Sequence, residues 1–149
     1  MWKEKVDEIR KRRERRNRLV NNGISRNQLR VFQNEVNKRF NYDLPKEYID
    51  FLEIINGIDH NGLVLYGIDD WINNDINHQQ VTGYIDTNEI WYQNEAQKTY
   101  LFFGDSNISW YCYDLKNKVY VELDKPSGEL EREYQGFNEM IERALTNVL

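Results

Sequence analysis

Residues 100–124 read YLFFGDSNISWYCYDLKNKVYVELD, and this stretch decides the fold. An apolar run at 100–103 is followed by two segments in which apolar and polar residues alternate. Alternation at period two indicates β-strands, and the Gly-, Asp- and Asn-containing segments between the runs are typical of turns. The stretch therefore predicts a meander of three antiparallel strands, with Trp110 on one face of the middle strand and Tyr111 on the other.

Segments on both sides of the meander have the spacing of amphipathic helices. Residues 137–148 carry apolar side chains at every third or fourth position, which predicts a C-terminal helix. Ser25 begins a capping-box pattern and opens a helix that ends near Asn41. Another helix begins at Pro45 and ends before Gly57, because proline suits a first turn and glycine suits the residue after a helix.

Three further segments complete the fold prediction. Residues 62–67 form a short apolar run bounded by glycines and are predicted to be a central strand. Residues 68–80 show no sustained period and are predicted to be an ordered loop, whereas residues 86–97 are predicted to form a helix capped by Asp86. The expected class is α+β, with a single antiparallel sheet and helices packed on one side.

The N-terminal segment differs in charge from the rest of the chain. Residues 1–39 hold 13 Lys or Arg against 5 Asp or Glu, whereas residues 40–149 hold 7 against 20, within a net charge of −5. Residues 2–20 lack Gly and Pro and are predicted to be a helix whose few apolar side chains pack only weakly. We therefore predict a basic helical arm over residues 1–22 and an α+β domain over residues 23–149.

Arginines are dense enough in this arm to contact nucleic acid or a scaffold. The candidates are Arg10, Arg12, Arg13 and Arg16. The alternative is a solvated helix face docked onto the acidic body, because glutamates are interspersed among the arginines. The acidic chain, with a pI of about 5.1, argues against nucleic acid as the partner, and a homodimer through the arm remains open.

Composition limits the compartment and the class of protein. A chain of 149 residues fits one ordinary domain, and the lone Cys112 excludes an internal disulfide framework, which favours a reducing compartment. No apolar stretch approaches the roughly 20 residues that cross a bilayer, and the first residues are charged. We expect a cytoplasmic protein that does not bind membranes.

Motifs of known catalytic chemistry are absent from the sequence. It has no glycine-rich phosphate loop, nucleophile elbow or Cys-x-x-Cys pair. His60 and His78, the only histidines, stand near several aspartates, but they lack the spacing of a metal site. The position of Cys112 on the strand face of Trp110 predicts a core residue. We expect no enzyme activity, no metal and no cofactor.

A protein partner is the better expectation for the acidic body. Acidic groups steer a basic partner, and Trp and Tyr anchor protein interfaces. Asp69-Asp70-Trp71 combines both features beside a strand end, and the turn and middle strand of the meander add further residues. The predicted partner-binding residues are Asp69, Asp70, Trp71, Asp105, Tyr111 and Tyr113.

Several segments together resemble the SUKH superfamily, which includes fungal cell-wall-synthesis regulators and bacterial immunity proteins. Residues 44–52, LPKEYIDFL, with Asn56-Gly57, resemble its LP-x-x-Y-x-x-F-L … N-G segment. Residues 102–114 resemble its F-G-D … Y-x-x-D hairpin, and residues 137–141 resemble its closing helix. The small bacterial branch called YrhA-like is the most similar.

The resemblance implies an α+β fold without catalysis and a cleft that neutralises a cognate toxin, often a nuclease or deaminase, in the cytoplasm. Two features depart from the family pattern: Gly136 replaces a serine before the last helix, and the basic helix over residues 2–20 has no counterpart. A regulatory or scaffold protein that binds through this helix is the alternative hypothesis.

Overall fold

The computed structural model describes residues 1–18, 20–73 and 81–149. Within these residues the helices are α1 (Trp2–Arg15), α2 (Arg26–Phe40), α3 (Lys46–Ile54), α4 (Tyr84–Trp91) and α5 (Phe137–Thr146), with a 3₁₀ helix at Glu95–Thr99. The strands are β1 (Ile58–His60), β2 (Leu63–Leu65), β3 (Tyr100–Asp105), β4 (Ser109–Asp114), β5 (Val119–Asp124) and β6 (Leu130–Tyr134). None of these helices is long and apolar enough to cross a bilayer.

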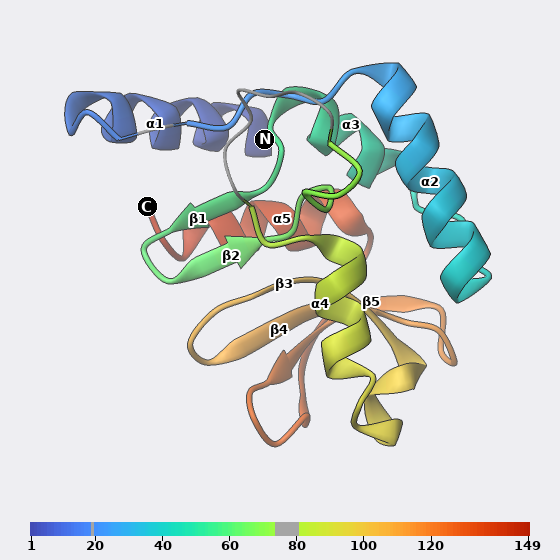
Figure 1. Ribbon diagram of the computed structural model, residues 1–149. Coiled ribbons are helices and arrows are strands. Elements are labelled where there is room, and N and C mark those ends of the chain that lie inside the picture. The colour runs from blue at the N-terminus through green and yellow to red at the C-terminus, as the bar shows by residue number, and fades with distance from the viewer. Residues whose placement is uncertain (19, 74–80) are drawn as a thin grey trace.

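All six strands form one antiparallel sheet in sequence order, which confirms the α+β class (Figure 1). The predicted meander is β3 to β5, and its register pairs Phe102 with Cys112 and Cys112 with Val121. Strands β1 and β6 were not predicted. β1 has only three residues, and residues 131–133 of β6 are charged and exposed at the sheet edge, so neither strand shows an apolar pattern.

Three predicted helices are confirmed. The Ser25 hydroxyl accepts a hydrogen bond from the Gln28 N–H at the start of α2, and Asn41 ends this helix in the left-handed region. α3 begins after Pro45 and ends at Ile54 with the extended residue Ile55 as its C-cap, so Gly57, although its φ is +78°, does not directly follow the helix as predicted. α5 buries the apolar stripe that begins at Phe137.

The fourth predicted helix was placed wrongly. α4 begins two residues before Asp86 and ends at Trp91. Its cap comes from a distant residue: the Asp69 carboxylate accepts the N–H groups of Ile85 (3.0 Å) and Asp86 (2.9 Å). Gly83 allows this approach, because a Cβ there would lie 2.2 Å from Asp69 Oδ1. The preceding loop was predicted over 68–80; residues 68–73 contain no helix or strand, and residues 74–80 lie outside the described residues.

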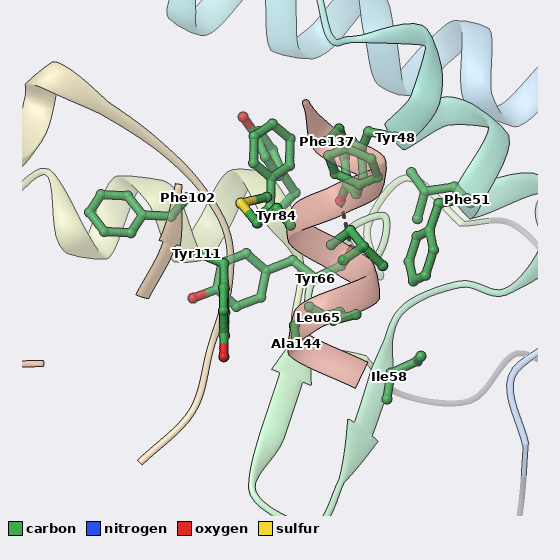
Figure 2. Packing of buried hydrophobic residues seen from close by; sticks show 14 of the residues in the cluster. Tyr48, Phe51, Ile58, Leu65, Tyr66, Tyr84, Phe102, Tyr111, Phe137 and Ala144 are labelled. Atoms are coloured by element: carbon green, nitrogen blue, oxygen red, sulfur yellow. Dashed lines mark hydrogen bonds between the residues drawn. The ribbon is translucent and has the colours of Figure 1, made fainter. Parts of the chain in front are cut away.

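α3 and α5 cover one face of the sheet. Phe137 of α5 packs on Tyr48 of α3, with ring centroids 5.6 Å apart, and on Phe103 of β3, at 5.4 Å. The Tyr48 hydroxyl donates a hydrogen bond to the Tyr66 carbonyl (2.7 Å), which ties α3 to the chain after β2. Figure 2 shows Phe137 and Tyr48 together in this aromatic cluster, with Phe102 lying away from them.

α4 lies against the part of the β3 edge that does not pair with β2. β2 pairs only with Gly104 and Asp105. Further along β3, the Asn88 side chain accepts a hydrogen bond from the Phe102 N–H (2.8 Å) and donates one to the Phe102 carbonyl (2.9 Å). Trp91 packs beside Phe102 and Trp110. One amide side chain thus satisfies the backbone groups that a neighbouring strand would otherwise pair.

The prediction that the N-terminal helix packs only weakly is wrong. Trp2 is 3% exposed, and Val6 and Ile9 are fully buried in the same core cluster as the sheet. α1 runs beside α5 (Figure 1), and Lys5 forms an ion pair with Glu142 at 2.9 Å. Three apolar side chains on one stripe are enough to hold the helix, because the stripe faces another apolar helix. The proposed division at residue 22 stays a prediction.

Candidate functional site

A cavity of about 500 Å³ lies at one end of the sheet. Its walls come from the β1–β2 turn, the β3–β4 turn and the residues after α5, and its floor comes from β4 and β5. The lining residues are Asn61, Gly62, Leu63, Ser106, Asn107, Ile108, Ser109, Tyr111, Glu122, Asn147 and Val148. Concave sites that combine apolar walls with a few polar groups are typical binding sites.

The β1–β2 turn is a tight hairpin. Asn61 and Gly62 both have positive φ, 50° and 86°, as a two-residue type I′ turn requires. The Asn61 amide donates a hydrogen bond to the Val148 carbonyl (3.0 Å), so the turn is tied to the segment after α5. Gly62 lies against Asn107, which brings the second turn to the same place.

The β3–β4 turn holds an apolar side chain in solvent at the cavity wall. Ile108 is 69% exposed. The Ser106 hydroxyl accepts hydrogen bonds from the N–H groups of Ile108 (3.3 Å) and Ser109 (3.1 Å). The Ile108 carbonyl accepts the N–H of Lys125 (3.0 Å). The backbone of this turn is therefore fixed before any partner binds, which reduces the entropy lost on binding.

The cavity floor carries a buried carboxylate. Glu122 accepts hydrogen bonds from the hydroxyls of Ser109 (2.7 Å) and Tyr134 (2.7 Å). Burial, followed by the neighbouring carboxylate Glu122, raises the pKa of Tyr134 and also that of Tyr111 above the ordinary value of 10. A carboxylate has about four acceptor positions, so Glu122 keeps acceptor capacity for a donor that enters the cavity.

Charged side chains of both signs lie on the edge strand beside this floor. Glu131 and Glu133 are exposed on β6, which pairs with β5. Burial, and then the carboxylates of Glu122 and Asp124, raise the pKa of Glu131. Glu131 is thus a second carboxylate near Glu122, whereas Arg132 stands opposite Glu122 in the register and Glu133 stands opposite Val121, on the other face of the sheet.

The six predicted partner-binding residues do not form one site. Asp69 is fully buried as the cap of α4, so its prediction as a surface contact is wrong. Trp71 is 50% exposed, and its indole N–H donates to Asp86 (3.2 Å) while the Arg39 guanidinium lies 4.9 Å from its ring centroid. Asp70 is half-buried beside it. Trp71 and Asp70 thus remain on the surface, away from the cavity lining.

The other three residues occupy three separate places. Asp105 accepts hydrogen bonds from the Tyr66 hydroxyl and from Lys125 Nζ (3.1 Å). Tyr113 packs against Tyr120, with ring centroids 4.8 Å apart. Only Tyr111 lines the cavity, where it is almost fully buried. The sequence did not point to Glu122 or Ile108 as site residues. The Asn61-Gly62 dipeptide is a hairpin signal, and it could have indicated the β1–β2 turn that forms the neighbouring wall of the cavity.

Burial of Asp69 predicts a pH dependence of stability. Its pKa is raised to about 6 because desolvation outweighs the two N–H hydrogen bonds. Since the pKa is higher in the folded state than the ordinary 3.8, the folded protein binds this proton more tightly, and stability falls as pH rises from 3.8 towards 6, by up to about 1.4 kcal/mol per pH unit. Urea unfolding at pH 5 and pH 7 measures this loss of stability. In Asp69→Asn, the difference in unfolding free energy between the two pH values should be smaller than in the wild-type protein. An equal difference in the two proteins would contradict the raised pKa of Asp69.

Arginines of the basic arm are largely engaged within the chain. Arg10 donates hydrogen bonds to the carbonyl of Ile54, at the end of α3, and to the carbonyl of Asn21, between α1 and α2. Arg12 pairs with Glu8 (3.0 Å), and Arg13 donates to the Asp59 carbonyl (2.8 Å). Arg16 is exposed. Three of the four predicted contact residues thus have structural partners, which favours the interpretation of a helix docked onto the body.

Cys112 lies in the core, and the described residues contain no cluster of metal-ligating side chains. Cys112 is fully buried, as predicted, and burial raises its thiol pKa, so the reactive thiolate is disfavoured. Among the described residues, no group of three or more His, Cys, Asp or Glu side chains is placed to hold a metal ion. His78 lies outside those residues.

The chain belongs to the SMI1 / KNR4 family (SUKH-1), whose model matches residues 23–143. The match covers the sheet, α2, α3, α4 and most of α5, and it confirms the resemblance to the SUKH superfamily; the YrhA-like branch stays a prediction. It begins after α1, so this helix lies outside the matched range. A search of curated proteins finds no match.

Proposed function

We propose that this protein is a non-catalytic immunity module whose cavity receives part of a basic partner protein, a cognate toxin. The observation that carries the proposal is the cavity with Glu122 on its floor and the exposed Ile108 in its wall. Binding proteins often place an apolar anchor beside buried polar groups that select the partner.

Charge supports a basic partner. Residues 40–149 hold 7 Lys or Arg against 20 Asp or Glu, and Glu131 of β6 lies close to the floor carboxylate of Glu122. A negative field steers positively charged proteins towards the surface and speeds association. Nucleases and deaminases are basic where they hold nucleic acid, and an acidic inhibitor bound over such a site would exclude the substrate.

The family supports a role of this kind. Members of the SUKH superfamily include bacterial immunity proteins, and the fold of the present chain is of this family. The alternative, a scaffold protein that binds nucleic acid through Arg10, Arg12, Arg13 and Arg16, is less favoured because three of these residues are engaged within the chain.

Co-expression with toxin-like proteins encoded by adjacent genes tests the proposal. The wild-type protein should restore growth and co-purify with one of them. Ile108→Arg should weaken the complex by about 100-fold, because it replaces an apolar anchor with a cation that repels a basic partner. Val31→Arg is the matched control, since Val31 is similarly exposed on α2 and does not line the cavity.

Two results would contradict this proposal. One is that no adjacent protein is bound or neutralised. The other is that Ile108→Arg and Val31→Arg bind as tightly as the wild-type protein, which would place the partner on another surface.

A further inference from the structure

Glu122, on the floor of the acidic cavity, is a buried carboxylate without a cation beside it. The residue is 9% exposed, and its two oxygens accept hydrogen bonds from neutral groups, the hydroxyls of Ser109 and Tyr134. Within the residues that the structure describes, Glu122 forms no ion pair. Buried carboxylates in proteins are usually paired with a cation or bound to a metal ion. The floor therefore holds a charge that the described part of the chain does not neutralise.

The cation that stands opposite Glu122 in the sheet does not fill this role. Arg132 of β6 pairs with Glu122 of β5 in the register. Its side chain is exposed and makes no ion pair with any described residue. On the β6 side, the Glu122 carboxylate is instead bonded by the Tyr134 hydroxyl. The open approach to Glu122 is the cavity that its side chain lines.

Amide side chains at the mouth of the cavity add hydrogen-bond acceptors. Asn61 and Asn107 line the cavity and are exposed. Asn61 uses its amide nitrogen to bond the Val148 carbonyl, so its oxygen is left as an acceptor. Asn107 makes no hydrogen bond within the described ranges. A group with several N–H donors would thus find acceptors both on the floor and at the mouth.

Arginine matches this arrangement better than lysine does. A guanidinium presents five N–H donors in one plane and is weakly hydrated, whereas an ammonium is compact and strongly hydrated. The exposed Ile108 offers an apolar surface for the methylene groups of an arginine stem. At roughly 30 Å³ per water molecule, the cavity of about 500 Å³ also has room for the backbone next to the side chain.

We propose that the cavity binds an arginine side chain of the partner protein. Its guanidinium pairs with Glu122, and its stem packs against Ile108. The choice of partner rests on the proposed function: a nuclease or deaminase toxin uses cationic side chains to hold phosphate groups. Capture of such an arginine would remove a phosphate contact of the toxin, because the same N–H donors bind a carboxylate or a phosphate.

A blocked tripeptide, acetyl-Gly-Arg-Gly-amide, tests the cavity without any toxin. Its binding to the full-length protein is followed by NMR at constant ionic strength. We expect the amide signals of residues 106–109 to shift saturably. The lysine peptide should bind about threefold more weakly, and the citrulline peptide, which has the shape of arginine without its charge, at least about tenfold more weakly.

Substitutions of two neighbouring glutamates separate the ion pair from the general field. Glu122→Gln keeps the shape of the floor and should weaken binding of the arginine peptide at least about tenfold. Glu131→Gln removes the same charge nearby, but Glu131 is exposed and does not line the cavity, so the loss should not exceed about twofold. Backbone NMR spectra verify that both variants are folded. The citrulline comparison uses the wild-type protein and does not depend on either variant.

Three results would overturn the arginine site. They are that the arginine peptide does not bind, that the citrulline peptide binds equally well, and that Glu131→Gln weakens binding as much as Glu122→Gln does. A toxin complex that Glu122→Gln leaves unchanged would also contradict the arginine site, while the proposed function would stand. Conversely, specific binding of the arginine peptide together with the failure to find any neutralised protein would contradict the proposed function alone.

Discussion

Replacement of Asn88 with alanine is expected to lower the free energy of unfolding by about 3–5 kcal/mol. The Asn88 amide makes three buried hydrogen bonds, one to the Tyr84 carbonyl and two to the backbone of Phe102. Alanine would leave the Phe102 N–H and C=O groups buried without partners, and each such group costs about 1–3 kcal/mol. Urea denaturation measures the loss.

Asn34→Ala is the matched control, because Asn34 is an exposed asparagine within α2. Its effect should stay within about 0.5 kcal/mol. Hydrogen exchange gives a second readout, since the Phe102 amide should exchange faster in Asn88→Ala. A loss below about 1 kcal/mol with slow exchange at Phe102 would show that the edge of β3 is satisfied in another way.

Trp2→Ala should destabilise the protein by about 3–5 kcal/mol, although Trp2 belongs to the segment predicted to be a loosely packed arm. The indole ring lies 5.4 Å from the Phe51 ring centroid, and its N–H donates to Asn138 Oδ1 (3.2 Å). Truncation would open a cavity between α1, α3 and α5. The same urea experiment measures this effect.

Lys11→Ala is the control for this prediction, because Lys11 is exposed on the same helix. We expect a change of no more than about 0.5 kcal/mol. Equal stability of Trp2→Ala and the wild-type protein would mean that α1 detaches in solution. If the predicted loss occurs, deletion of residues 1–20 would also damage the core. Such a deletion could therefore not serve as a clean test of whether the basic arm binds nucleic acid.

Local sequence patterns were enough to predict those helices and strands whose own residues show a clear periodicity or cap. The alternation in residues 108–123 predicted the meander, and the Ser25 cap and the Pro45 start marked α2 and α3 at their observed positions. β6 was not predicted, because its residues Glu131, Arg132 and Glu133 are charged and exposed and give this edge strand no apolar face.

Candidate site residues were harder to predict than elements. Asp69 has the composition of a surface acid, yet it caps a helix that begins 15 residues later along the chain. Tyr111 was expected on a partner surface, and it is almost fully buried in the cavity floor. Neither burial nor a distant cap can be read from neighbouring residues, because both depend on which segments the fold brings together.

By itself, the sequence determined the α+β class, the three-stranded meander, the core position of Cys112 and the family, since these follow from local periodicity and short motifs. The tertiary structure alone decided that α1 joins the core, that Asp69 caps α4, and that three separated loops enclose Glu122. The physical reason is that hydrogen bonds and burial act between residues close in space, whereas periodicity reports only neighbours along the chain.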